Sequence, residues 1–572
     1  MMYFVKTIQL FFIFIFAVFH SDIALGKNTK FNYSKENIAN YFSGIVSVNQ
    51  NNTTAGFKYL NKVKSISNFH ENYNIQFIHS LVLLDKFDQA FIFSKDIWEE
   101  DKFIFEVDLL LGIDSFLKKD YLRAKKHFKR LNRISRYNLF FDDFFGNLMI
   151  SWVHAAENNK KDSFKFFEAI PNRYEKLKKI NYSFLQCFFD LPETESAFSD
   201  LSSTKQLSFS RYNFFLANYL LSKNKNKSAE TVIENSRDLF SSNLLIKETE
   251  IFLKNGNSKE ITNIFNCQNT RDSIAEIFYI VANLYSSQKD YKLSNFYLKI
   301  SLFLNKKFIP NKALLAENYL NQKKNESAKK VYYSIKSFGP TFAWHAHGNL
   351  ATIIAETLGK EKAVKYLEKE INLLPDPNFE NYYDIANFYK NHEYYMESVK
   401  YYSLALNNMN YDSFLIPKVL DRRGTSYERM GEWDKAEKDL LESIQISPDQ
   451  PHVLNYLAYS WIEKRMNLER SLEMLKKANN LRKNDGYIID SIGWGYFVSQ
   501  NYIDAKKYLQ RAVEIFPLDP IINDHYADTL WMLNKPIQAR YIWQHVLSLD
   551  KVEEELRNNI NKKLVYGVEQ KL

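Results

Sequence analysis

A small residue recurs about every 34 positions along most of this chain, each time between two segments whose apolar residues are spaced as in helices. The positions are Gly56, Ala90, Ala124, Ser163, Ala197, Ala229, Ser294, Ala328, Ala363, Ser398, Ala436, Ser471, Ala505 and Ala539. One slot, near Ile261, holds a residue that is not small. This period is that of a helix–turn–helix repeat whose two helices touch at one crowded point. The sequence therefore predicts an all-α solenoid of about 14–15 repeats.

Length and composition agree with a repeat protein. A chain of 572 residues exceeds one compact core, yet no Pro/Gly/Ser-rich linker divides it. In a solenoid each repeat buries its apolar face against its neighbours, so a long chain needs neither a single compact core nor linkers between domains. Hydrophobic residues at 45% and charged residues at 25% argue against disorder.

The net charge of +9 does not indicate nucleic-acid binding. A nucleic-acid binder gathers Lys and Arg on one face, whereas here they alternate with Asp and Glu. The longest basic cluster, 125–130, includes the packing residue Phe128, so we interpret it as a solvated helix face.

The N-terminus has the features of a secretory signal peptide. Lys6 precedes the run Ile8–Phe19, which is apolar apart from Gln9, and Ala24–Gly26 offers a cleavage site before Lys27. Polar residues at 20–22 end the run before the roughly 20 apolar residues that a spanning helix needs. We expect export, and the alternative is a retained N-terminal anchor, which would be the chain's one contact with a membrane.

The two cysteines are Cys187 and Cys267. The repeat register predicts Cys187 on a first helix and Cys267 on a second helix two repeats later. Successive helices lie about 8–10 Å apart, and a disulfide needs Cα atoms within about 7 Å. We therefore expect two buried free thiols.

The repeat at 486–519 is the most regular. Gly493 on its first helix faces Ala505 on its second, and Pro517 ends the second helix. The pattern resembles the tetratricopeptide repeat (TPR), at its large-Leu-Gly-Tyr…Ala…Phe…Ala…Pro positions. The likeness is strong over 417–550, looser over 37–400 and weakest over 200–270. It implies a right-handed α-solenoid.

The C-terminal residues resemble the last repeats of exported TPR proteins of Gram-negative bacteria. The likeness rests on Asn455–Tyr459, Asp490–Trp494, Asn523–His525, Ala539–Arg540 and Trp543. It implies a periplasmic or envelope-associated location and a protein-binding role, without naming a substrate. The sequence thus divides into a signal peptide (1–26), degenerate repeats (27–270), central repeats (271–415), well-formed repeats (416–550) and a capping helix with tail (551–572).

No enzyme motif occurs in the chain. His-Glu-x-x-His, a Gly-rich phosphate loop and Gly-x-Ser-x-Gly are all absent from the sequence. His345 and His347 would lie about 200° apart on a helix, so they are interpreted as ordinary polar contacts rather than metal ligands. We expect no catalytic residue, cofactor or metal.

One periodic set of polar residues stands out. The fifth and ninth positions of the first helix in the last four repeats are Asp421, Thr425, Asn455, Tyr459, Asp490, Trp494, Asp524 and Asp528. By resemblance to TPR domains these positions line the concave groove, where they could bind an extended protein segment. The alternative is that these Asp and Asn residues cap helices or bond adjacent repeats. TPR proteins that grip a free C-terminal carboxylate use Lys and Arg in the groove, so the acidic sign of this set disfavours that mode.

We therefore expect a non-enzymatic exported TPR scaffold that binds a protein partner in its C-terminal groove, in envelope assembly or maintenance. One alternative is an accessory subunit of an envelope enzyme, or a cryptic enzyme. Another is a self-assembling solenoid, which the polar segment after Asp550 argues against.

Overall fold

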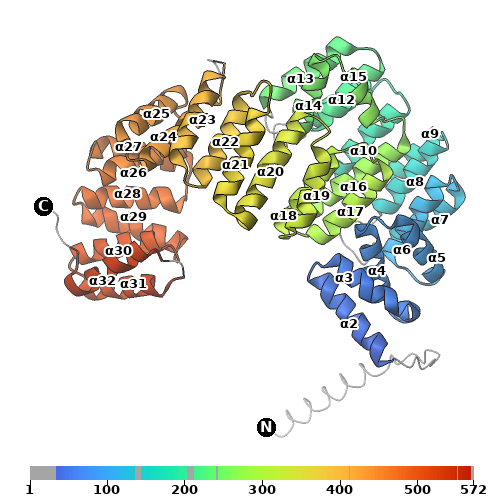
Figure 1. Ribbon diagram of the computed structural model, residues 1–572, viewed down its shortest axis with the longest axis horizontal. Helices are drawn as coiled ribbons and strands as arrows, with labels where there is room; N and C mark the ends of the chain where they lie inside the picture. The colour runs from blue at the N-terminus through green and yellow to red at the C-terminus, as the bar shows by residue number, and fades with distance from the viewer. Residues whose placement is uncertain are drawn as a thin grey trace, which may run out of the picture. The chain divides into compact units, whose positions relative to one another are not determined.

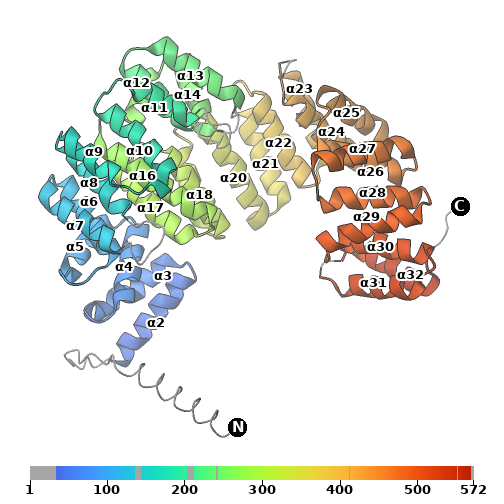
Figure 2. The ribbon, with the colours of Figure 1, turned by 180° about the vertical axis from the view of Figure 1, so that it is seen from behind.

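The computed structural model describes residues 34–134, 143–202, 211–239, 243–410, 413–550 and 552–568, and these residues form helices joined by short turns (Figures 1 and 2). The expected signal peptide, 1–26, lies outside them. No helix in this part of the chain has the length and apolar character needed to span a membrane. The chain divides into two compact units, Met1–Ala343 and Trp344–Leu572, each described below by itself.

The helices of the first unit follow one another in pairs. They are α2 (Lys35–Asn49), α3 (Thr53–Leu60), α4 (Glu71–Leu83), α5 (Phe87–Ile97), α6 (Phe105–Leu117), α7 (Tyr121–Ile134), α8 (Phe145–Ala156), α9 (Lys160–Glu168), α10 (Glu175–Phe188), α11 (Thr194–Ser202), α12 (Arg211–Ser222), α13 (Asn226–Leu239), α14 (Leu244–Lys254), α15 (Ser258–Ile264), α16 (Thr270–Ser287), α17 (Tyr291–Leu304), α18 (Pro310–Asn321) and α19 (Asn325–Ile335), with 3₁₀ turns at Asn61–Ile66 and Asn172–Tyr174. Helix α20 (Pro340–Leu358) begins at the end of this unit.

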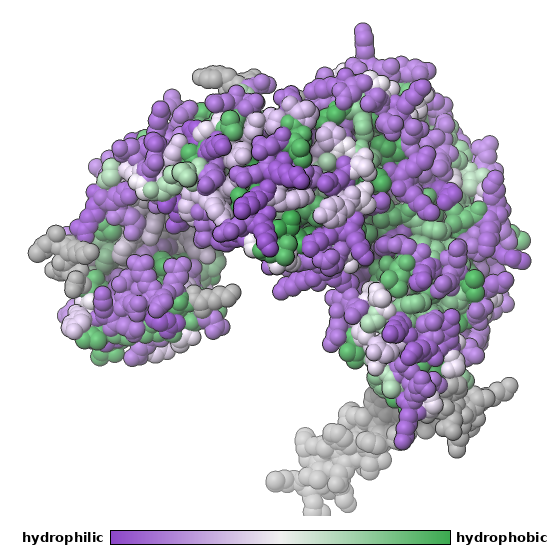
Figure 3. All heavy atoms as spheres, viewed as in Figure 1, coloured by the Kyte–Doolittle hydropathy of each residue, from purple (hydrophilic) through white to green (hydrophobic). Residues whose placement is uncertain are grey.

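The second unit continues the pairs and adds one last helix. Its helices after α20 are α21 (Lys360–Asn372), α22 (Phe379–Asn391), α23 (Tyr395–Asn407), α24 (Ile416–Arg429), α25 (Trp433–Ile446), α26 (Pro451–Glu463), α27 (Leu468–Leu481), α28 (Gly486–Val498), α29 (Tyr502–Ile515), α30 (Pro520–Met532), α31 (Pro536–Ser548) and α32 (Glu554–Tyr566). Hydrophilic side chains cover most of the face shown in Figure 3.

The fold is an all-α solenoid of fifteen helix pairs in the described residues, as the 34-residue period predicts. Small residues let the helices of a pair approach closely. A Cβ added to Gly112 would lie 2.3 Å from Phe128 Cε1, and one added to Gly493 would lie 2.5 Å from Leu509 Cγ. A larger side chain at these positions would push the two helix axes apart.

Each pair turns through a residue with positive φ, and the turn between α26 and α27 contains a second one, Asn467. Three of these residues are glycines, namely Gly256, Gly359 and Gly431. The other twelve, apart from Asn467, are Asn51, Asp85, Lys119, Asn158, Asp190, Asn224, Lys289, Lys323, Glu393, Arg465, Gln500 and Asn534. The repeat in which Ile261 replaces the small residue is therefore an ordinary helix pair, and Gly256 makes its turn. A left-handed residue ends the first helix and redirects the chain.

In the first unit, distant repeats also pack together, beyond the neighbour contacts that the sequence predicts. Helices α16 and α17 lie against α4, α8 and α10 (Figures 1 and 2). The rings of Phe87 and Phe303 stack with centroids 4.0 Å apart, and Lys299 Nζ lies 2.6 Å from Asp85 Oδ2. One continuous apolar core therefore runs through this unit, from Val48 to Leu315.

The expectation of two free thiols is wrong. Cys187 on α10 and Cys267 form a disulfide, with Cα atoms 5.9 Å apart. Helix α15 ends at Ile264, so Cys267 lies in the segment before α16 rather than on a second helix. That segment is free to approach α10 more closely than two packed helix axes can.

Candidate functional site: the groove of the C-terminal repeats

The eight residues predicted to line a groove lie on the first helices of the last four pairs, all within the second unit. Asp421 and Thr425 are on α24, Asn455 and Tyr459 on α26, Asp490 and Trp494 on α28, and Asp524 and Asp528 on α30. The eight residues differ in their surroundings. Those on α28 and α30 bind other parts of the chain, although Asp490 of α28 also lines a pocket, and those on α24 and α26 border open pockets.

The carboxylates on α30 hold the last helix. Lys563 of α32 lies between them, with Nζ 2.8 Å from Asp524 Oδ2 and 2.7 Å from Asp528 Oδ2. Trp543 Nε1 donates to the other oxygen of Asp528 at 3.2 Å. Burial, followed by the nearby Asp524 carboxylate, raises the pKa of Asp528. This end of the predicted groove is therefore occupied by the protein's own lysine.

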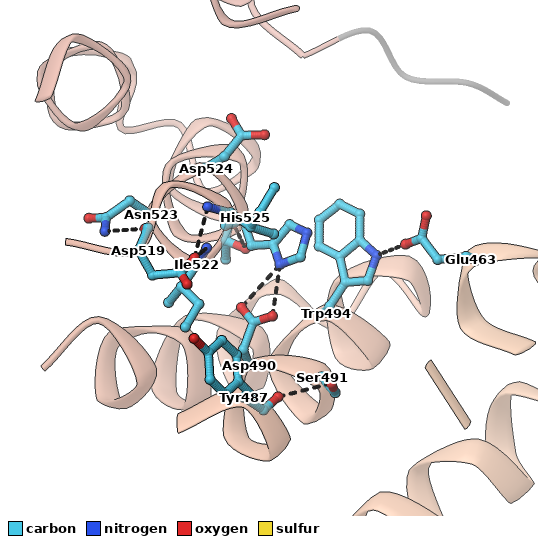
Figure 4. A network of polar contacts seen from close by, with 12 residues as sticks. Glu463, Tyr487, Asp490, Ser491, Trp494, Asp519, Ile522, Asn523, Asp524 and His525 are labelled. Carbon is cyan, nitrogen blue, oxygen red and sulfur yellow. Dashed lines mark hydrogen bonds and ion pairs between the residues drawn. The ribbon is translucent and has the colours of Figure 1, made fainter. Parts of the chain in front are cut away.

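The residues on α28 join three successive repeats (Figure 4). His525 Nδ1 of α30 donates to both oxygens of Asp490, at 3.0 and 3.1 Å. The Trp494 ring stacks on His525 with centroids 4.0 Å apart, and its Nε1 donates to Glu463 of α26. Burial opposes the charged imidazole, but Asp490 outweighs it, so the pKa of His525 is raised. These contacts are the inter-repeat bonding that the sequence leaves open as an alternative.

A tyrosine-lined pocket lies between α26, α28 and α30. It has a volume of about 240 Å³ and is lined by Asn455, Tyr456, Tyr459, Tyr487, Asp490, Ser491, Asp519, Ile521 and Ile522. Asn455 Oδ1 is buried and accepts no hydrogen bond from the described residues. Burial, followed by Glu463, raises the pKa of Tyr459, and the Glu463 carboxylate accepts a hydrogen bond from the Tyr459 hydroxyl. The pocket thus combines aromatic faces with amide and hydroxyl groups. We call it the tyrosine pocket.

A second pocket adjoins the first, because Tyr456 lines both. It has a volume of about 700 Å³ and is lined by Lys390, Lys418, Asp421, Arg422, Thr425, Arg429, Asp449, Gln450, Pro451, His452, Val453 and Tyr456. Asp421 Oδ1 lies 3.9 Å from His452 Nδ1, and Thr425 donates to the Asp421 carbonyl of its own helix at 2.8 Å. We call it the basic pocket.

The four cations of the basic pocket are missing from the sequence-based prediction. The sequence contains a pattern that could have indicated two of them. Arg422 directly follows Asp421, and Arg429, seven residues after Arg422, lies on the same face of the helix as Arg422. Lys390 belongs to the preceding pair, at the end of α22, so only the packing of the pairs brings it to this pocket.

The histidines at 345 and 347 have separate surroundings. His347 Nδ1 lies 2.8 Å from the Tyr366 hydroxyl, and burial lowers the pKa of His345 to about 4. In the described part of the chain no group of three His, Cys, Asp or Glu side chains is placed to hold a metal.

Comparison with known proteins finds repeat proteins of one kind. No protein-family profile matches the chain. Over 99 residues it is 30% identical to the TPR repeat-containing protein PA4667 of Pseudomonas aeruginosa, a match that spans 17% of this chain and 17% of that protein.

Two solved structures are similar over about a third of the chain. One is a tetratricopeptide repeat protein from Parabacteroides merdae, with a TM-score of 0.34 and 16% identity, covering 38% of this chain and 86% of the other. The second is the TPR protein TTC0263 of Thermus thermophilus, with a TM-score of 0.29 and 16% identity, covering 32% and 98%.

Proposed function

Because the chain is a tetratricopeptide repeat protein, we propose that it is a non-enzymatic scaffold that holds an extended segment of a partner protein across α24, α26 and α28. The observation that carries this proposal is the pair of adjoining pockets on these first helices. Side chains from successive repeats line both, so a segment that crosses the repeats would contact each in turn. A groove built on rigid helices loses little ordering entropy when it binds.

The binding surface is smaller than the eight-residue set predicts. Asp524 and Asp528 are bound to Lys563, and Asp490 to His525, so these carboxylates already have partners within the chain. The open surface is instead formed by Asp421, Asn455 and Tyr459 together with neighbouring tyrosines and cations.

We also propose that the protein acts outside the cytosol, in the bacterial cell envelope. The apolar run at Ile8–Phe19 with its small-residue cleavage site supports export. The Cys187–Cys267 disulfide adds support, because disulfides persist mainly in oxidising compartments.

End-to-end assembly into a filament is less well supported. Helix α32 packs against α31 and places Lys563 between the carboxylates of α30. Ile560 of α32 is fully buried in the last apolar cluster. The last pair is therefore covered by a helix of the chain itself, as the capping of a solenoid requires.

Site-directed photocrosslinking tests the groove. A photoreactive phenylalanine analogue at Tyr487, which is 55% exposed in the tyrosine pocket, should crosslink a partner in envelope extract, and mass spectrometry should map the crosslink to one extended segment. The control carries the same analogue at Tyr541, which is 73% exposed on the second helix α31. Equal crosslinking at both positions would reject the groove.

A paired substitution tests whether the pocket itself provides the binding energy. The variant Tyr487→Ala/Ile521→Ser changes two exposed pocket residues, and Tyr541→Ala/Ile537→Ser makes the same chemical change elsewhere. Only the first variant should lose the mapped partner, with helicity unchanged in both.

A further inference from the structure

The basic pocket has an excess of positively charged side chains over negatively charged ones. Four Lys and Arg side chains line it, from α22 and α24, against two aspartates. This composition contrasts with the acidic set on α28 and α30, to which the same groove continues.

Three of these cations have no carboxylate at ion-pair distance within the described residues, namely Lys390, Lys418 and Arg422. Arg422 Nε is buried and donates no hydrogen bond there. Arg429 is paired with its own neighbour, Glu428, at 3.7 Å. Burial, followed by the nearby Arg422, lowers the pKa of Lys390. Like charges are thus crowded together around one cavity.

Arg423, the residue next to Arg422, has a structural role. Arg423 is held by Asp439, with Nε 2.7 Å from Oδ2 and a terminal nitrogen 2.9 Å from Oδ1. It also donates to Ser403 at 3.0 Å. Arg423 therefore bonds one helix to the next, whereas Arg422, one position earlier, lines the pocket beside Asp421 without an ion pair at contact distance. Packing accounts for the donors of Arg423, whereas Nε of Arg422 has no acceptor among the described residues.

We propose that the basic pocket binds acidic side chains, Asp or Glu, of the partner's segment. This inference rests on the proposed function and names the charge class of the partner. Arg and Lys donate strong, charge-assisted hydrogen bonds to carboxylates. It does not involve a free C-terminal carboxylate, the mode that the acidic set disfavours, because the ligand groups are side chains and the cations lie outside the fifth and ninth helix positions.

A protein segment fits this surface better than a nucleic acid does. The cations are confined to one part of the groove, and the adjoining tyrosine pocket includes Asp490 and Asp519. A nucleic acid carries a phosphate at every nucleotide and would place charges against those carboxylates. A peptide can carry its negative charge at one point and apolar or neutral residues beside it.

Fluorescence anisotropy with the whole chain tests the charge class. The probe is fluorescein-labelled, C-terminally amidated hexaglutamate, with hexalysine as the comparison peptide. Hexaglutamate should bind and hexalysine should not, and the affinity should fall as salt is added. Lys390→Gln/Arg422→Gln should weaken hexaglutamate binding about tenfold or more.

The control variant, Lys438→Gln/Lys507→Gln, removes two exposed lysines from the second helices α25 and α29 and makes the same change in net charge. It should change the affinity less than about twofold. Equal weakening by both variants would mean that only net charge matters and would overturn the proposal. Tighter binding of a single-stranded oligothymidine, lost in the same pocket variant, would overturn the assignment to a protein ligand.

The two proposals fail separately. A crosslink at Tyr487 with no hexaglutamate binding would reject the acidic ligand and keep the groove. Hexaglutamate binding that depends on Arg422, with no crosslinked partner, would keep the anion site and reject the scaffold groove.

Discussion

The Cys187–Cys267 disulfide makes a quantitative prediction about the first unit. The two cysteines are separated by 80 residues in the chain. The chain-entropy relation for a cross-link closing a loop of about 80 residues gives a stabilisation of about 4.5 kcal/mol at 25 °C. With an m value of about 3 kcal/mol per molar urea, the variant Cys187→Ala/Cys267→Ala should unfold about 1.5 M earlier.

The assay must read the first unit apart from the second. Hydrogen exchange followed by mass spectrometry, on peptides from α10 and α16 across a urea series, does so. Wild-type protein kept in reductant is the control, and it should unfold near the double variant. Two titratable thiols in oxidised, denatured protein would show that no bridge forms. A midpoint shift below about 0.3 M would refute the entropic argument.

Three further predictions concern the second unit. Gly493→Val should lower the free energy of unfolding by about 1–3 kcal/mol, because the larger side chain overpacks against Leu509. A melting temperature equal to that of the wild type would contradict this crowded contact. Lys563→Met should leave two buried carboxylates without their cation and lower the free energy of unfolding by about 2–3 kcal/mol. Hydrogen exchange in α32 should become faster, and unchanged exchange would show that Lys563 does not hold this helix. The Asp490–His525 pair raises the folded-state pKa of His525, so its contribution is full below about pH 6.5 and is lost as pH rises through that raised value. Between pH 5.5 and 9 the urea midpoint should therefore fall less steeply with pH in His525→Gln than in the wild type. If the two curves run parallel, the Asp490–His525 pair does not contribute to the pH dependence of stability.

The repeat architecture could be predicted because it depends on local residues. A small residue at each helix crossing and a turn of fixed length recur with the period, so sequence spacing is enough to find them. Even the slot with Ile261 keeps the turn, because Gly256 supplies the positive φ.

Contacts between distant repeats could not be predicted, because periodicity carries no information about them. Asp85 and Lys299 are 214 residues apart, and only the path of the solenoid brings them together. The disulfide was missed for a related reason: the repeat register places Cys267 on a helix, whereas α15 ends early and leaves it in a connecting segment.

The candidate site was predicted in part, for a physical reason. The fifth and ninth positions do place residues on first helices, but position alone cannot say whether a side chain has a partner within the chain. Asp490 meets His525 from the next repeat, and Asp524 meets Lys563 from α32. Arg422, at the sixth position, was overlooked because the periodic pattern does not include it.

The two pockets together constrain the shape of a bound segment. The basic pocket includes Arg422 of α24 and the tyrosine pocket includes Tyr459 of α26, the next first helix. Packed helices such as α26 and α28 lie roughly 10 Å apart, so a segment that contacts both residues must span about that distance. A polyproline II segment repeats its side-chain direction every three residues, over about 9.3 Å. A β-strand returns to the same face after about 6.6 or 13 Å, which fits less well.

We therefore expect the acidic residue to lie three positions from the residue that enters the tyrosine pocket. A series of amidated peptides with one glutamate moved from two to five positions from a single tyrosine, in an alanine and proline background, tests this. Affinity should peak at a separation of three, and the peak should vanish in Arg422→Gln. A flat series would reject the polyproline II geometry. A peak at two or four would reject it too and favour an extended strand, because the spacing of the pockets is fixed by the helices that line them.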